Sequence, residues 1–230
     1  MSSTDCIVLS IVVRIVGGKP FVRRCLSSLK EQIGSHAIEV IVPYDATVSD
    51  IDGLKREFPQ FFFFDVSGVQ TFTPDPIPAV AHALCDRHTS KGLGIARGEI
   101  IALVEDDATP AGDWCEQILA AHKLPYDVIG GAVEHTGRGT MNWAVYFLDF
   151  GRYQLPLSEG PASYLTDVNI SYKRAALDSV KAVWEREYNE VAVHWALMKK
   201  GAVLWRRPQI VVHQDRGSLS VMRQLRERFD

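Results

Sequence analysis

The segment Gly98–Pro110, with the sequence GEIIALVEDDATP, limits the possible folds of this chain more than any other. Its residues 100–104 form an unbroken apolar run rich in Ile and Val, which indicates a short strand buried on both faces. The run stops on three consecutive acids, Glu105, Asp106 and Asp107. Open α/β sheets bind ligands at the carboxyl ends of such strands. The sequence therefore predicts three carboxylates at a ligand-binding edge.

Adjacent carboxylates repel one another unless a cation lies between them. Oxygen ligands of this kind suit Mg²⁺ or Mn²⁺, which proteins commonly bind through one or two carboxylates together with substrate phosphates. The alternative is a solvated turn whose acids cap the following helix, because Asp is common at that position. Taken alone, the acidic triplet fits both interpretations.

The chain before this segment alternates between predicted strands and helices. Strands are expected at 6–13, 38–43 and 61–66, and helices from Phe21, from about 49 to 58, and over 79–96. This alternation predicts a parallel, doubly wound half that would suit a nucleotide. However, Gly17-Gly18, in the turn that ends with Pro20, is not a GxGxxG fingerprint, and the sequence contains no Walker loop.

The second half of the chain has less regular signals. A strand is expected at 127–134, where the pair Gly130–Gly131 would let another group approach the backbone closely. Shorter strands are expected at 167–171, 203–205 and 209–213, and a helix at 186–201. The tail places a row of apolar residues on one helical face: Leu219, Met222, Leu225 and Phe229.

Composition excludes several classes of protein. The net charge of -3 argues against bulk nucleic-acid binding. The four cysteines form no CxxC pair, so neither a zinc site nor a disulfide framework is expected, and reduced thiols in a cytoplasm are the simplest interpretation. No window approaches the roughly 18 apolar residues of a spanning helix, and no signal peptide is evident. We expect a single domain over residues 1–230.

The order of these features resembles the family-two glycosyltransferases, whose fold is called GT-A. The resemblance covers nearly the whole chain and depends on the order and spacing of several short motifs. These are Ser27–Gln32 on the first helix, Asp45 after the second strand, Gly94–Glu99 before the acidic strand, Glu105–Pro110 as the DXD motif, Asn189-Glu190 before Gly201, and Pro208 followed by His213.

The resemblance implies an α/β domain with a mostly parallel central sheet flanked by helices. Residues up to about 110 would form the nucleotide-binding half, and residues from about 111 the acceptor-binding half. The implied activity is inverting, metal-assisted transfer of a sugar from a UDP-, GDP- or dTDP-sugar to a glycan, lipid-linked or small-molecule acceptor, as in polysaccharide biosynthesis. The implied location is cytoplasmic, with peripheral membrane contact through the tail as an alternative to simple packing of that helix.

The family pattern also implies roles for particular residues. Glu105, Asp107 and His213 would bind Mn²⁺ or Mg²⁺, although a histidine beside a strand is also common without any metal. Glu190 would be the general base, since a carboxylate must take the proton of the acceptor hydroxyl; its ordinary role would be a favourable acid in the first turn of a helix. The nucleotide sugar would contact Arg14, Asp45, Lys91, Asp106 and Asp107.

Some positions depart from the family pattern. Arg14–Gly17 stands where the family has Pro-Thr-Tyr-Asn, which removes polar contacts near the base and adds a cation. Asn189 stands where an acid is expected. These departures leave a decayed nucleotide-sugar-binding domain as one alternative. A nucleotidyltransferase is another, although no Gly-rich phosphate loop lies near the N-terminus.

Aromatic residues are concentrated in the segment 142–153. They would either stack on sugar rings or, as large apolar side chains usually do, fill the core. They are Trp143, Tyr146, Phe147, Phe150 and Tyr153.

Overall fold

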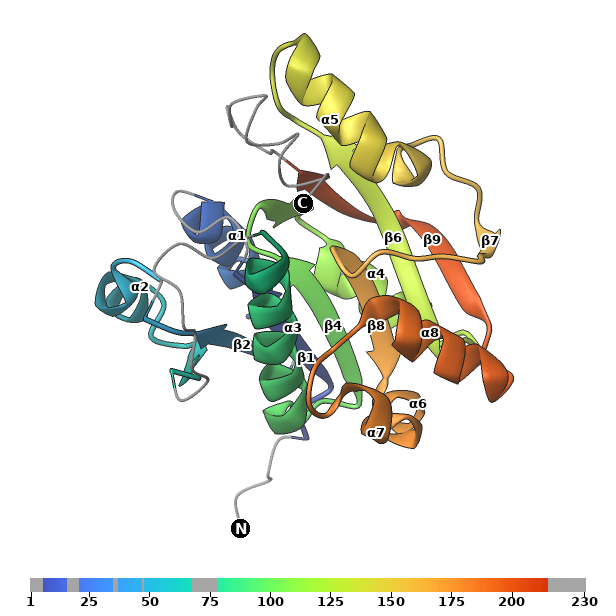
Figure 1. Cartoon of the computed structure of the whole chain (residues 1–230), viewed down its shortest axis with the longest axis horizontal. Helices are drawn as coiled ribbons and strands as arrows, with labels where there is room; N and C mark the ends of the chain where they lie inside the picture. The colour runs from blue at the N-terminus through green and yellow to red at the C-terminus, as the bar shows by residue number, and fades with distance from the viewer. Residues whose placement is uncertain (1–5, 16–20, 35–36, 47, 68–77, 215–230) are drawn as a thin grey trace.

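A computed structural model describes residues 6–15, 21–34, 37–46, 48–67 and 78–214, with only the backbone described for 78–84. The turn expected at Gly17–Pro20 and the apolar tail helix lie outside these residues. One nine-stranded sheet runs through the described chain in the order β3-β2-β1-β4-β8-β6-β9-β5, and β7 adds to β9 (Figure 1). The strands are β1 (Leu9–Arg14), β2 (Ile38–Tyr44), β3 (Phe62–Asp65), β4 (Ile100–Glu105), β5 (Ala108–Pro110), β6 (Val128–His135), β7 (Gly160–Pro161), β8 (Asn169–Lys173) and β9 (Leu204–Gln214).

Helices lie on both faces of this sheet. They are α1 (Phe21–Lys30), α2 (Ile51–Glu57), α3 (Pro78–Ile95), α4 (Trp114–Ala121), α5 (Thr140–Phe150), α6 (Arg174–Ser179), α7 (Lys181–Trp184) and α8 (Glu190–Lys199), with a short 3₁₀ turn, η1 (Gly151–Tyr153), after α5. The α/β class and the order of the early strands and helices are confirmed. None of the helices in the described residues is both long enough and apolar enough to cross a membrane.

Two apolar cores separate the helices by face. Alternate residues of β1 point to opposite sides, so Ile11 joins the core under α1, α2 and α4, whereas Val12 joins the core under α3, α6, α7 and α8. The same alternation in β4 sends Leu103 to the second core. Arg14 and Glu105 follow two residues after Val12 and Leu103, so they point to the α3 and α8 side.

The sheet is more mixed than the mostly parallel arrangement that the sequence suggests. β3, β2, β1 and β4 are parallel, and β6 is parallel to β9. β8 runs antiparallel to both β4 and β6, and β5 and β7 run antiparallel to β9. The short apolar segments in the second half of the chain do not indicate whether a strand pairs in parallel or antiparallel, because both kinds of strand use similar apolar residues.

The two short strands expected around Pro208 are in fact one strand, β9. Its pairing with β6 shifts between Gly130 and Ala132, so a bulge in β9 accommodates the proline, which has no backbone N–H to donate. The sequence also gave no indication of β5, or of α5 in the aromatic segment. Within that segment Tyr146, Phe150 and Tyr153 are buried, whereas Trp143 and Phe147 are exposed.

The glycine pair in β6 permits the close approach that its sequence suggests. A Cβ at Gly131 would lie 1.9 Å from the carbonyl oxygen of Ile210 and 2.4 Å from Nδ2 of Asn169. That amide nitrogen donates to the carbonyls of Ala132 and Ile210, while Oδ1 of Asn169 accepts from the Trp114 indole. The group that approaches Gly131 is therefore the bulge of β9, held by a buried asparagine.

Gly131→Ala should lower the free energy of unfolding by about 2–3 kcal/mol, because the added methyl group meets backbone that cannot move independently. Chemical denaturation would measure this. Gly94→Ala is the matched control, since nothing lies within 4 Å of its Cβ position and it sits in α3; it should stabilise by about 0.5–1 kcal/mol. Equal stability of Gly131→Ala and the parent would contradict this account of the bulge.

Candidate functional site

Parallel pairing of β1 with β4 brings an arginine and an acid together at the carboxyl edge of the sheet. Arg14 and Glu105 are partners in register at the ends of these two strands. Arg14 is only 5% exposed, and its Nη1 lies 3.8 Å from Oε1 of Glu105. Arg14 and Glu105 are the only charged residues of β1 and β4, and each is the last residue of its strand.

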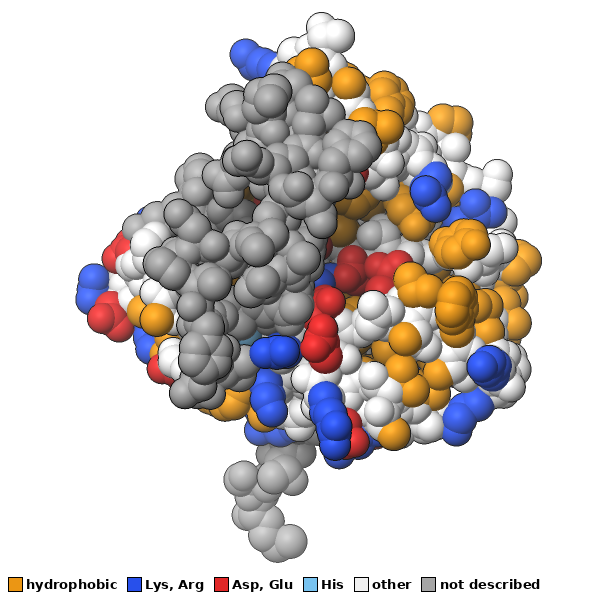
Figure 2. All heavy atoms as spheres, in the orientation of Figure 1, with side chains coloured by type: hydrophobic (Ala, Val, Ile, Leu, Met, Phe, Trp, Pro, Cys, Tyr) orange, Lys and Arg blue, Asp and Glu red, His pale blue; other side chains and the backbone are white. Residues whose placement is uncertain are grey.

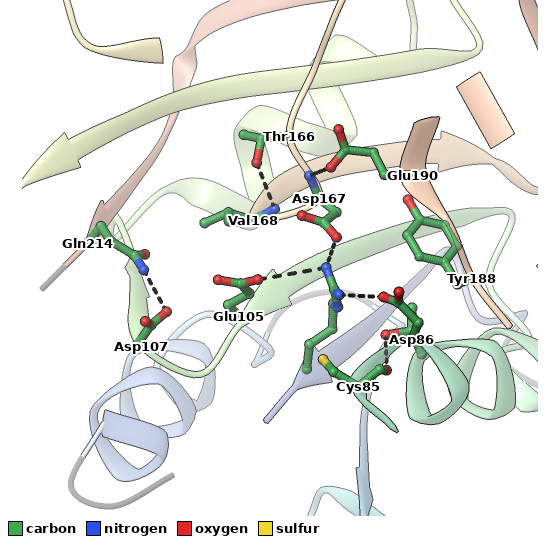
Figure 3. A network of polar contacts seen from close by, with 12 residues as sticks. Cys85, Asp86, Glu105, Asp107, Thr166, Asp167, Val168, Tyr188, Glu190 and Gln214 are labelled. Atoms are coloured by element: carbon green, nitrogen blue, oxygen red, sulfur yellow. Dashed lines mark hydrogen bonds and ion pairs between the residues drawn. The ribbon is translucent and has the colours of Figure 1, made fainter. Parts of the chain in front are cut away.

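Two further carboxylates surround the same guanidinium (Figure 3). Nη2 of Arg14 donates to Oδ1 of Asp86 on α3 at 3.0 Å, and Nη1 donates to Oδ2 of Asp167. Burial alone would lower the pKa of Arg14, but its acidic neighbours, together with Cys85 and Tyr188, raise it above its ordinary value. Arg14 is therefore a permanent cation that holds three acids from distant parts of the chain.

Asp167 reaches this cluster because β8 is antiparallel to β4. Val104 pairs with Asn169, so the residues that precede β8 lie beside the residues that end β4. A parallel β8 would have placed its carboxyl end there instead. The backbone N–H of Asp167 donates to Oε2 of Glu190 at 2.8 Å. Arg14 thus connects to Glu190 through one residue.

Glu190 is the first residue of α8 and is half-buried. Burial, followed by the charges of Glu105 and Asp86, raises its pKa to about 7, although Arg14 and Arg152 oppose this. The preceding residue, Asn189, is the N-cap, and its side chain accepts from the Ala192 N–H at 2.9 Å. Asn189 thus has a structural role of its own where the family pattern has an acid.

A buried hydroxyl network lies beneath this part of the site. Tyr188 packs under Arg14, whose guanidinium carbon is 5.9 Å from the ring centroid. The hydroxyl groups of Tyr188 and Tyr172 are 2.7 Å apart, and His194 Nε2 lies 3.0 Å from Tyr172. Burial raises the pKa of both tyrosines and lowers that of His194 to about 4, so all three are neutral near pH 7. This network of two tyrosines and a histidine therefore carries no charge.

The acidic triplet is buried, so it is not a solvated turn. Glu105, Asp106 and Asp107 are 8%, 1% and 3% exposed. The Asp106 N–H donates to the Arg14 carbonyl at 2.8 Å, and Oδ1 of Asp107 accepts from Nε2 of Gln214 at 2.7 Å. Oε2 of Glu105 is buried, and no hydrogen-bond donor among the described residues reaches it.

The buried Oε2 of Glu105, which no donor among the described residues reaches, suits a divalent cation. Together with Asp107, whose Oδ1 accepts from Gln214, Glu105 supplies the one or two carboxylates that magnesium-type sites use with substrate phosphates. A fuller protein cage is not formed: among the described residues, no three His, Cys, Asp or Glu side chains are grouped to hold a metal. His213 pairs with Thr109 of β5, and its side chain points to the opposite face from Gln214, the residue that contacts Asp107. Its role as a ligand stays a prediction.

Helix α1 holds the turn that follows the triplet. Ser28 Oγ donates to the Pro110 carbonyl at 2.7 Å, and Gln32 Nε2 donates to the Ala111 carbonyl at 2.9 Å. Gln32 also accepts from the Cys115 N–H at the start of α4. The Ser–Gln pattern seen in the sequence therefore fixes the acidic segment in place.

The other two expected contacts of the nucleotide are Asp45 and Lys91. Asp45 follows β2, and its Oδ2 is 3.4 Å from His88 Nε2 on α3. Burial lowers the pKa of His88, although Asp45 opposes this. Lys91 is exposed on α3, and no bond between it and the site is found in the described residues.

Asp86, Asp167 and Gln214 were not identified from the sequence. Asp86 lies within a helix whose pattern gives no reason to select it. Asp167 precedes a strand, and only the antiparallel direction of β8 brings it to the edge. Gln214 follows His213 directly, and alternation along β9 makes it the one that faces Asp107.

Comparison with known proteins gives one family match and several structural matches. Residues 88–181 match the family model described as Glycosyl transferase family 2. No curated protein sequence matches the chain. Similar solved structures include S. aureus TarS 1-349, with a TM-score of 0.60 and 14% identity over 90% of this chain, and the same protein in complex with UDP-GlcNAc, with a TM-score of 0.59 and 14% identity over 94%.

The mannosyltransferase PcManGT from Pyrobaculum calidifontis, in complex with GDP-Man and Mn²⁺, matches with a TM-score of 0.61 and 15% identity over 96% of this chain. In each case the chain spans 60% of the length of the matched structure. At these identities the likeness concerns the fold.

Arg14→Met should lower the free energy of unfolding by about 3–5 kcal/mol, because it leaves buried acids without their counter-charge. The loss should shrink at acidic pH, where protonation removes the repulsion. Arg23→Met is the control: Arg23 also bonds two acids, Glu57 at 2.7 Å and Asp50 at 3.0 Å, but at 40% exposure water screens them. If denaturation gives similar small changes for both variants, the cluster does not stabilise the fold.

Proposed function

We propose that this chain is a family 2 glycosyltransferase, which transfers a sugar from a nucleotide-diphosphate sugar to an acceptor hydroxyl with inversion. The match of residues 88–181 to the glycosyl transferase family 2 model and the likeness of its sheet to solved glycosyltransferases support this proposal. Two structures of similar fold hold UDP-GlcNAc and GDP-Man. These ligands support a nucleotide-sugar donor and leave UDP-, GDP- and dTDP-sugars as candidates. A cytoplasmic location belongs to this proposal.

In this reaction the acceptor oxygen forms a bond to the anomeric carbon while the bond from that carbon to the diphosphate breaks. A single displacement of this kind inverts the anomeric centre. The acceptor hydroxyl loses its proton, and a nearby carboxylate accelerates the step by accepting it. The diphosphate leaves with the electron pair and gains negative charge.

Glu190 carries the proposal. It begins a helix beside the buried acids of the sheet edge, and its pKa of about 7 suits a group that must take a proton near neutral pH. The hydrogen bond from the Asp167 N–H fixes Oε2, so Oε1 is the oxygen we assign to the acceptor proton. Arg14 keeps the Asp167 loop in position from below.

The donor would lie along the carboxyl edge between β2 and β5. Asp45 would accept a hydrogen bond from the base, and Asp106, Asp107 and Lys91 would contact the rest of the nucleotide sugar. Glu105 and Asp107 would hold Mn²⁺ or Mg²⁺, whereas His213, on the face of β9 opposite Gln214, stays a predicted ligand only. Such an ion would neutralise the charge gained by the diphosphate. For Arg14, pairing with three acids supports ordering the site rather than binding phosphate.

Glu190→Gln should reduce sugar transfer by about a hundredfold or more, since the amide keeps the bond to Asp167 but cannot take a proton. The transfer rate of the parent should increase with pH, and the midpoint of this increase should lie near pH 7, where Glu190 becomes ionised. Transfer would be measured with UDP-, GDP- and dTDP-sugars over a panel of acceptors, and donor affinity should not change.

Stability separates this effect from misfolding. The pKa of Glu190 is raised on folding, so its contribution to stability is complete below its ordinary value of 4.5 and is lost as pH rises through about 7. Glu190→Gln should therefore match or exceed the parent's stability above pH 7. Glu187→Gln is the control, because Glu187 is exposed and its partner Arg87 is 3.6 Å away. Transfer at the parent's rate by Glu190→Gln would rule out this base.

Asp107→Ala should abolish the Mn²⁺-dependent part of nucleotide binding while the protein stays folded, because it removes a carboxylate ligand. Calorimetric titration with UDP and GDP, each with and without MnCl₂, would measure it. Asp113→Ala is the control, since Asp113 is exposed in the same segment and contacts Gln117. Unchanged Mn²⁺-dependent affinity in Asp107→Ala would refute the metal assignment.

A further inference from the structure

Helix α5 presents an apolar face to the solvent. Met141, Phe147 and Leu148 are 46%, 54% and 68% exposed, and Trp143 is 38% exposed. The opposite face packs onto the protein through Val145, Tyr146 and Phe150. Hydrophobic side chains gather over α5 in Figure 2, and Figure 1 shows this helix at the end of β6, away from the other helices.

The exposed face of α5 carries no charged residue. Its exposed positions are Thr140, Met141, Trp143, Ala144, Phe147 and Leu148. The one charged residue of the helix, Asp149, is only partly exposed and has an interaction partner. A polar solvent face is usual for a surface helix, so this helix is suited to another environment on that side.

The helix is held rigidly from beneath. The Tyr146 hydroxyl donates to the Val133 carbonyl at 2.6 Å, and the rings of His135 and Tyr146 stack at 4.9 Å. Trp143 packs edge-on against His135 at 4.4 Å. These contacts between α5 and β6 hold the apolar face of the helix in one orientation.

Arginines stand at both ends of this face. Arg138 precedes α5 and Arg152 follows it, and both are exposed. An apolar helical face with Trp and Phe, bordered by basic residues, suits the boundary between the headgroups and acyl chains of an anionic bilayer. A second copy of the chain suits it less, because two-fold pairing across α5 would bring arginine next to arginine.

We propose that α5 is an interfacial helix that binds the protein to anionic lipid membranes through Met141, Trp143, Phe147 and Leu148, with Arg138 and Arg152 contacting the headgroups. The helix would lie in the plane of the interface and not cross it. This proposal goes beyond the proposed function and does not depend on it.

Vesicle flotation tests the proposal on the full chain. We expect binding to phosphatidylcholine vesicles that contain phosphatidylglycerol and much weaker binding to phosphatidylcholine alone. The double variant Phe147→Ser, Leu148→Ser should lose about tenfold or more in partitioning, because two apolar side chains no longer enter the bilayer. Arg138→Glu should lose roughly fivefold or more, and only with the anionic vesicles.

Phe62→Ser is the matched control, because Phe62 is 55% exposed on β3 at the other edge of the sheet, and it should bind like the parent. Trp143 emission, isolated by comparison with Trp143→Phe, should shift to the blue on anionic vesicles. Failure of the parent to bind either vesicle would overturn the proposal, as would equal binding by the double variant.

Two other outcomes would assign the face to a different occupant. If ultracentrifugation shows a dimer that the double variant dissociates, and the parent does not bind vesicles, α5 is a contact between two copies. If vesicle binding appears only after removal of residues 216–230, the chain's own C-terminal segment covers the face. Either result contradicts membrane binding by the full chain.

Discussion

The guanidinium of Arg14 lies between carboxylates that come from α3, from the end of β4 and from the loop before β8. Removing so many charges from water is costly, and it is compensated only when all of them are paired. Every segment that brings a charge to this cluster must therefore adopt one relative position. The cluster forms only if β1 pairs with β4 in its parallel register and β8 pairs with β4 in its antiparallel register.

The rest of the site is built outward from that cluster. Asp167 links Arg14 to Glu190: its side chain accepts from Arg14, and its backbone N–H donates to Glu190. On the other side, Ser28 and Gln32 of α1 fix the turn after Asp107, and Gln214 fixes Asp107 itself. Oε1 of Glu105 contacts the cluster, whereas no hydrogen-bond donor among the described residues reaches its Oε2, so this acid belongs to the cluster and also suits the proposed cation.

The aromatic segment shows how one stretch of sequence serves two environments. Tyr146 and Phe150 fill the core, whereas Phe147, one position along, is exposed with Leu148. A helical period of 3.6 residues produces this division, because neighbouring positions point about 100° apart. The segment was expected to be mainly core or a sugar-stacking surface. Its folding as α5 separates these aromatics into buried and exposed groups.

The sequence by itself determined the parts of this protein that depend on local pattern. It determined the buried strand that ends at Glu105, just before Asp106 and Asp107, because a short run of Ile, Leu and Val followed by acids favours a buried strand with charge at its end. It also determined the helix that begins at Glu190 and the close approach at Gly131, where only a residue without a side chain fits.

Only the tertiary structure decided which distant charges meet. Asp86 and Asp167 belong to the site because of helix packing and the direction of β8, and neither leaves a trace in local spacing. The choice between His213 and Gln214 as the partner of Asp107 depends on the register of β9 after a bulge, and a shift of one residue reverses it. Arg14 was expected to contact the nucleotide sugar, and the fold surrounds it with acids instead, because a buried cation requires counter-charges.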